Sequence, residues 1–207
     1  MKMRCLIFIS LLFPSLMHAA VAPICKPLPF LKGGFQAEKY KRCTTLMNQC
    51  PASGALPSAD CAKEVGKDAA CNQLNKLAEA LGTSITQIAM KQINAFRIVG
   101  IYFPADGQNH YFILTPKNCL VDTIIDPRKL DKSLEAKYPK TSFIIVNWNE
   151  PQFKKSNDAE NFTAVLKITD TCMACKVIGW ATLKFNFDKN GNYVSVDLVN
   201  FSVTEPK

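Results

Sequence analysis

The feature that most constrains this chain is a set of cysteines behind an export-like segment. Nine cysteines occur in 207 residues. The first lies in an apolar run, Cys5–Met17, which follows the cationic residues Lys2 and Arg4. This run is about thirteen residues long, whereas a transmembrane helix needs roughly twenty. Small residues follow the run, so we predict a secretory signal peptide over residues 1–20. The alternative is an uncleaved membrane anchor.

Cleavage leaves a mature chain with few catalytic side chains. We favour a cut after Ala20, because a cut after Ala22 would place Pro23 directly after the bond. The mature chain keeps every cysteine except Cys5, and His110 is its only histidine. Its net charge falls from +8 to +6 with the loss of the two N-terminal cations. No later apolar stretch is long enough for a membrane span after cleavage.

The even number of remaining cysteines indicates a disulfide framework in an oxidising compartment. In a cytosolic protein the same residues would instead suggest a metal site or catalysis. We therefore predict an exported protein, either periplasmic or extracellular, that is stabilised by disulfide bonds.

Helix geometry restricts how the first cysteines pair. Cys43 and Cys50 share one predicted helix and lie about 10 Å apart along it, at ~1.5 Å per residue. A disulfide needs Cα atoms within roughly 7 Å, so these two cannot bond to each other. Cys61 and Cys71 are excluded as a pair by the same argument. The simplest arrangement is a helical hairpin with nested bonds, so we expect Cys50–Cys61 near the turn and Cys43–Cys71 farther from it. We expect the remaining pair, Cys25–Cys119, to join the N-terminal arm to the sheet.

The N-terminal part of the chain has the apolar period of helices. The sequence Ser84-Ile85-Thr86-Gln87 matches a capping box and opens a segment whose apolar residues fall on one helical stripe. The expected helices cover residues 36–49, 58–65, 68–81 and 84–95.

After Phe96, apolar and polar residues alternate along some segments, and other segments are continuously apolar. Both patterns are typical of β-strands. Turn-forming residues such as Asp188–Asn192 separate these runs. The expected strands cover residues 97–103, 110–115, 119–125, 142–148, 162–169, 177–187 and 193–203, with a short helix possible over 129–138.

The predicted fold class is therefore α+β: disulfide-linked N-terminal helices followed by an antiparallel β-sheet, with helix 84–95 packed on the sheet. The predicted regions are a Cys-rich helical region over 21–95 and an antiparallel β-sheet region over 96–207. They form either one domain or two.

The Cys172-Met173-Ala174-Cys175 motif has two interpretations. A thiol oxidoreductase places such a motif at a helix N-terminus, where the helix dipole lowers the pKa of the first thiol. Here the residues that follow, beginning with Lys176, are strand-like. The favoured interpretation is a structural one: either a disulfide that closes the tip of a hairpin or pairing of these cysteines with others in the chain.

The usual catalytic motifs are missing from the sequence. It has no His-Glu-x-x-His, no Gly-x-Ser-x-Gly and no phosphate-binding glycine pattern. A small secreted hydrolase that uses two carboxylates is the main alternative to a binding protein, although no spacing selects a pair. Its candidate acids are Asp122, Asp126, Asp131 and Glu150. A zinc site from Cys119, Cys172, Cys175 and His110 lacks a second Cys-x-x-Cys, so we predict no metal and no cofactor.

The excess of lysine and arginine over acidic residues is spread along the chain, which favours weak attraction to anionic surfaces. The clusters contain few arginines and no interleaved aromatics, which argues against specific nucleic-acid binding. The basic clusters are Lys39, Lys41 and Arg42; Arg128, Lys129 and Lys132; and Lys154 with Lys155.

Two segments have the composition of interaction sites, residues 103–111 and 148–153. The second combines an aromatic anchor with a proline-stiffened loop, and its candidate residues are Trp148, Pro151 and Phe153. The alternative, of equal weight, is that Trp148 ends a buried strand. The sequence thus predicts an exported, non-enzymatic protein that binds another macromolecule, either a protein or an anionic surface ligand.

Overall fold

Strict alternation of side chains builds the centre of the fold. In the computed structural model, strands β10 (Ala159–Asp170) and β11 (Val177–Asp188) pair in antiparallel register over most of their length. Every second residue along them is buried, because successive side chains of a strand point to opposite faces.

The structure describes residues 25–205 except for 32–36, 51, 54–55, 58, 82–86, 104–107, 140 and 156–158. The predicted signal peptide lies outside the described residues.

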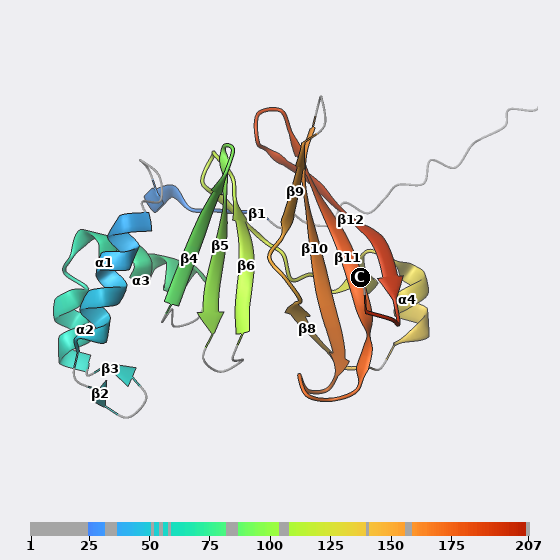
Figure 1. The fold of residues 1–207 in the computed structure, drawn as a ribbon, viewed down its shortest axis with the longest axis horizontal. Helices are drawn as coiled ribbons and strands as arrows, with labels where there is room; N and C mark the ends of the chain where they lie inside the picture. The colour runs from blue at the N-terminus through green and yellow to red at the C-terminus, as the bar shows by residue number, and fades with distance from the viewer. Residues whose placement is uncertain are drawn as a thin grey trace, which may run out of the picture.

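Two antiparallel sheets make up most of the structure (Figure 1). The first sheet has the order β1-β7-β6-β5-β4, and the second has the order β12-β11-β10-β8 with β9 also paired to β10. The strands of the first sheet are β1 (Cys25–Pro27), β4 (Gln87–Ile93), β5 (Phe96–Phe103), β6 (Gln108–Leu114) and β7 (Cys119–Asp122). The second sheet adds β8 (Phe143–Asn147), β9 (Gln152–Lys155) and β12 (Tyr193–Ser202).

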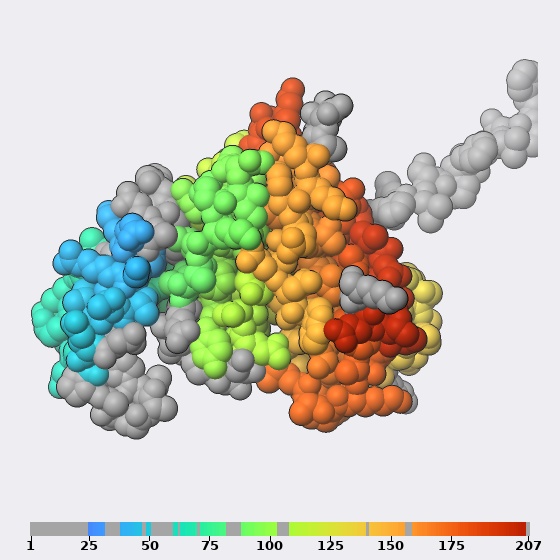
Figure 2. Space-filling view, in the orientation of Figure 1, coloured from blue at the N-terminus to red at the C-terminus, as the bar shows by residue number. Residues whose placement is uncertain are grey.

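Apolar side chains fill the space between the sheets, which lie against each other in the space-filling view (Figure 2). Phe96, Phe162 and Phe187 meet there, with ring centroids 4.9–5.8 Å apart in edge-on geometry. This inter-sheet core takes residues from both sheets, including Ile98, Ile113 and Val121 from the first and Leu166, Leu183 and Phe185 from the second.

The helices lie on the other side of the first sheet (Figure 1). They are α1 (Ala37–Asn48), α2 (Ala59–Val65) and α3 (Ala69–Leu81), with the short 3-10 helix η1 (Pro29–Leu31) and the small strand pair β2 (Ala52–Ser53) and β3 (Leu56–Pro57). A second apolar cluster joins Tyr40, Leu74 and Leu77 of the helices to residues of the first sheet, among them Val99, Phe112 and Leu120. The first sheet is therefore buried on both faces.

Four cysteine pairs lie at disulfide-bonding distance, and they are the four pairs expected from the sequence. Cys43–Cys71 and Cys50–Cys61 link the helices, while Cys25–Cys119 ties β1 to β7. Cys172–Cys175 closes the connection between β10 and β11. Their Cα–Cα distances are 5.1, 5.6, 5.6 and 5.0 Å, respectively.

The prediction of a helix over residues 84–95 packed on the sheet is wrong. Residues 87–93 form β4, which pairs with β5 from Gln87↔Tyr102 to Ile93↔Phe96. The apolar residues of this short segment fit either period, and pairing with β5 satisfies its backbone groups along the whole strand. Asn94 adopts φ 52°, the left-handed conformation that a tight hairpin turn requires.

Strand β12 forms an edge of the second sheet and carries two β-bulges. Its register with β11 shifts between Asn200 and Leu198 and again between Ser195 and Tyr193. The extra residues, Val199 and Val194, are strongly exposed. A bulge interrupts the ladder and increases the local twist of the strand.

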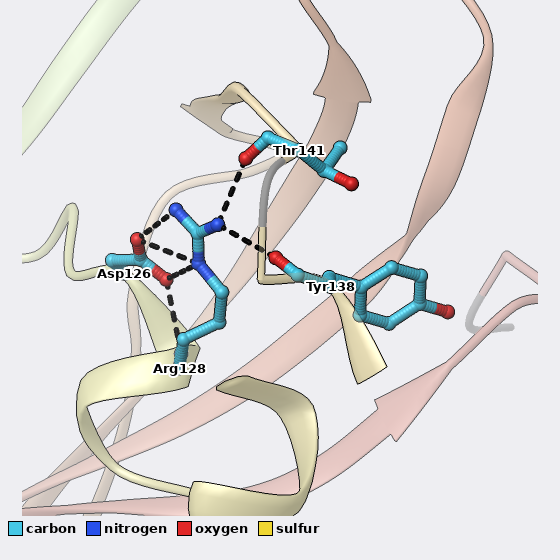
Figure 3. A network of polar contacts seen from close by, with 4 residues as sticks. All are labelled: Asp126, Arg128, Tyr138 and Thr141. Atoms are coloured by element: carbon cyan, nitrogen blue, oxygen red, sulfur yellow. Dashed lines mark hydrogen bonds and ion pairs between the residues drawn. The ribbon is translucent and has the colours of Figure 1, made fainter. Parts of the chain in front are cut away.

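The connection from β7 to β8 contains η2 (Pro127–Lys129) and α4 (Lys132–Lys137), with α4 on the far side of the molecule beside β12 (Figure 1). Arg128 holds this connection together (Figure 3). Its guanidinium donates to both carboxylate oxygens of Asp126 at 2.6–3.0 Å, and to the carbonyl oxygens of Tyr138 and Thr141 at 3.1 and 2.8 Å. It also lies 4.0 Å from the ring centroid of Phe143.

We expect Arg128→Ala to lower the free energy of unfolding by about 2–3 kcal/mol at pH 7. A hydrogen bond to a charged group contributes roughly 1.5–3 kcal/mol, but water screens the partly exposed pair with Asp126 and reduces the sum over its bonds. The Tyr138 and Thr141 carbonyls also lose their donor. Burial alone would raise the pKa of Asp126, but the hydrogen bonds and charge of Arg128 outweigh it and lower that pKa. The stabilisation is therefore complete above the unfolded pKa, about 3.9, and disappears as pH falls through the lower folded pKa.

The measurement is urea denaturation at pH 7 and at pH 3. The difference between Arg128→Ala and the wild type should shrink at pH 3. Arg128→Lys is the matched control, because lysine keeps the charge but lacks the planar fork of donors, and its loss should be intermediate. If both variants lost the same free energy of unfolding at pH 7 and at pH 3, the stabilising role given to the Arg128–Asp126 contact would be wrong.

Candidate functional site

A shallow pocket opens where the first and second sheets meet. It has a volume of about 230 Å³ and is lined by Gln108, Asn109, Tyr111, Asn147 and Trp148. The first three come from β6 in the first sheet, whereas the last two lie at the end of β8 in the second sheet. The pocket therefore joins the two segments, 103–111 and 148–153, that the sequence marked as candidate interaction sites.

Asn147 fixes the floor of the pocket. Its side chain is only 7% exposed, and its Oδ1 accepts a hydrogen bond from the Tyr111 backbone N–H at 2.9 Å. Its Nδ2 donates to Thr123 Oγ1 at 2.9 Å, and that hydroxyl donates to the Tyr111 carbonyl oxygen at 2.5 Å. These three hydrogen bonds close a ring across the two sheets. A buried polar group needs such partners, so the ring fixes the position of β8 against β6.

Trp148 forms the exposed wall of the pocket. Its backbone N–H donates to the Val165 carbonyl oxygen at 2.8 Å, which continues the ladder between β8 and β10. Its side chain is 44% exposed, unusual for a large apolar residue in this structure. The Lys167 ammonium lies 5.5 Å from the centroid of the ring and restrains it by a cation–π contact.

The lining residues carry no formal charge, but charged groups lie close by. Lys91 of β4 pairs with Glu150, two residues after Trp148, at 2.7 Å. Both side chains are substantially exposed, so this ion pair contributes little energy. It does link the loop that follows β8 to the edge of the first sheet.

The three predicted interaction residues do not form one exposed surface. Trp148 is exposed, whereas Pro151 is buried and Phe153 is half-buried. The ring of Phe153 lies 5.1 Å from that of Phe162 in the inter-sheet core. Sequence reasoning named the segment that contains Gln108, Asn109 and Tyr111, but it did not single out those side chains or Asn147.

The Cys172–Cys175 pair lies in the turn between β10 and β11. The Cys175 backbone N–H donates to the Cys172 carbonyl oxygen at 3.1 Å, and Thr171 adopts φ 58°. The segment that follows Cys175 continues into β11 and not into a helix. The motif therefore lacks the helix N-terminus that lowers a thiol pKa in thiol oxidoreductases.

The candidate hydrolase acids each have a separate structural partner. Asp126 binds Arg128, Asp131 accepts from the Ser133 backbone N–H at the start of α4, and Glu150 pairs with Lys91. Burial raises the pKa of Asp122, against the opposing effects of a hydrogen bond from the Ile124 N–H and the charge of His110. The four carboxylates do not converge on one cleft in the described part of the chain.

The basic clusters are partly neutralised by neighbouring acids. Arg42 pairs with Asp68 at 3.4 Å, and Lys132 pairs with Glu135 at 3.1 Å. Arg128 is bound to Asp126, as described above. Within the described residues, no group of three or more metal-ligating side chains gathers, and no helix has the length and apolarity of a membrane span. Cys119 and the two hairpin cysteines of the hypothetical zinc site are joined in disulfides.

Comparison with protein-family models, curated proteins and solved structures found no match. Multiple disulfides fit an exported protein.

Proposed function

We propose that the protein is exported, to the periplasm or the extracellular space, and binds another macromolecule there through the pocket around Trp148. The observation that carries this proposal is the exposed indole of Trp148 at the rim of an open pocket. Tryptophan is enriched among the residues that dominate binding energy, because it combines a large apolar area with few rotatable bonds.

The disulfide framework and the buried hydrogen-bonded ring support this proposal. Asn147, Thr123 and Tyr111 hold the backbone beneath the indole, so Trp148 is presented from a rigid base. A preorganised site loses less conformational entropy when a partner binds. Disulfides also preserve such a surface outside the cell, where reducing conditions are absent.

Site-specific photo-crosslinking tests the proposal. A photoactivatable phenylalanine analogue at position 148 should give a discrete higher-mass adduct when the folded protein is exposed to secreted and surface fractions of its source. The matched control places the same analogue at Val199, which is also strongly exposed but lies on β12. Equal adducts at both positions, or none at position 148, would contradict the proposal.

Trp148→Ala should abolish retention of the same partner on immobilised protein. It should change the free energy of unfolding by no more than about 0.5 kcal/mol, as an ordinary surface substitution does. Thermal unfolding followed by circular dichroism checks the second expectation. A variant that is destabilised by several kcal/mol would instead show that Trp148 is a packing residue.

A further inference from the structure

The chemistry of the pocket defines its ligand more closely than "a macromolecule" does. Its lining combines three primary amides with two aromatic rings, and none of the five side chains carries a charge. An ion would require compensating charge, and a purely apolar ligand would give the amides of Gln108 and Asn109 nothing to bond with, whereas the Asn147 amide is already bonded to Tyr111 and Thr123. The lining therefore fits a neutral ligand that is polar along its edges and apolar on one face.

We infer that the pocket binds a single neutral sugar residue, such as the terminal hexose of a glycan; this inference rests on the proposed binding function. Hydroxyl groups both donate and accept hydrogen bonds, as the amides of Gln108 and Asn109 also do. The C–H-rich face of a pyranose ring matches the exposed face of the Trp148 indole.

The size and shape of the pocket support one sugar unit over an extended peptide. A volume of about 230 Å³ is below the roughly 300–1,000 Å³ typical of sites for drug-sized ligands. A peptide would use a long groove or an open strand edge along which its backbone pairs. The pocket instead lies at the C-terminal end of β8, around Asn147 and Trp148, and does not extend along the strand.

The geometry also assigns separate roles to the lining residues. Trp148 provides the stacking surface, with its ring restrained by Lys167. Asn109 is exposed at the rim and is available to a ligand. Asn147 already bonds to the Tyr111 N–H and to Thr123, so it positions the floor of the pocket and is not a useful test residue.

Intrinsic fluorescence gives a direct assay, because the chain has only two tryptophans. In a full-length, disulfide-bonded Trp180→Phe variant, Trp148 is the only indole. Titration with the methyl glycosides of glucose, galactose, mannose and N-acetylglucosamine should give a saturable change with at least one of them. We expect dissociation constants near 1 mM, which corresponds to about 4.1 kcal/mol of binding free energy.

Calorimetric titration of variants separates the roles. Trp148→Ala should weaken binding of the responding glycoside by about tenfold or more, and Trp148→Tyr should restore much of it, because an aromatic face is retained. Asn109→Ala should also weaken binding. Its matched control, Asn200→Ala, changes an exposed asparagine on β12 and should have no effect.

The outcomes distinguish this inference from the proposed function. No saturable response to any of the four glycosides, or equal affinity in Trp148→Ala, overturns the sugar assignment. If the adduct at position 148 still forms in that case, the binding function stands with another ligand. If the adduct forms and enzymatic removal of glycans from the partner abolishes it, the binding function and the sugar assignment are both supported.

Discussion

Phe162→Ala is expected to lower the free energy of unfolding by about 3–5 kcal/mol, the range for large-to-small changes of buried aromatic residues. Phe162 is fully buried, and its ring lies 5.3 Å from Phe96, 5.8 Å from Phe187 and 5.1 Å from Phe153. It thus contacts residues of both sheets. Alanine would leave a cavity between the two sheets. The sheets could not move together to fill it, because the strands of each sheet are held in place by their own hydrogen-bonded ladders.

Urea denaturation followed by circular dichroism measures this effect. Val199→Ala is the control, because it shortens an apolar side chain of the same sheet that is 59% exposed. It should change the free energy of unfolding by no more than about 0.5 kcal/mol. If Phe162→Ala also lost less than about 1 kcal/mol, the inter-sheet core would not be the main source of stability.

Removal of the Cys25–Cys119 bond should have the second large effect. Its cysteines are 94 residues apart in sequence. In the chain-entropy model, a cross-link that closes a loop of this length stabilises the folded state by about 4.7 kcal/mol. We therefore expect Cys25→Ala/Cys119→Ala to lose about 4 kcal/mol, because the unfolded chain regains the freedom that the bond removes.

The Cys172–Cys175 bond provides an internal control, since its cysteines are only three residues apart. The same model gives about 2 kcal/mol for so short a loop. Cys172→Ala/Cys175→Ala should therefore be clearly less destabilising than the first double variant when both are measured by urea denaturation without reductant. Equal losses would show that loop length does not govern the contribution of these bonds.

Much of the second sheet was predictable from the sequence, because its strands follow one clear rule. The alternation along 162–169, 177–187 and 193–203, separated by turn residues, corresponds to β10, β11 and β12 within a few residues. Helix geometry pointed to the nested pairs Cys43–Cys71 and Cys50–Cys61. In contrast, the helix predicted over 84–95 is wrong, because the apolar residues of so short a segment fit the spacing of a helix and of a strand equally well. Pairing with β5, which lies outside the segment, makes it a strand.

The pocket could be predicted only as two separate segments. Its residues come from β6 and β8, which belong to different sheets, so their contact depends on how the sheets pack. The role of Asn147 depends on the Tyr111 N–H and on Thr123, which lie far from it in sequence. A local pattern contains no information about such a non-local hydrogen-bonded ring.

The two bulges of β12 also affect how copies of this protein meet at high concentration. An open strand edge is a template on which another copy can add its own strand and start a fibril. In β12 the regular ladder between the bulges is limited to Ser195–Leu198. An incoming strand would lose its register at either end of that short run. The bulges thus protect a valine-rich edge from self-assembly.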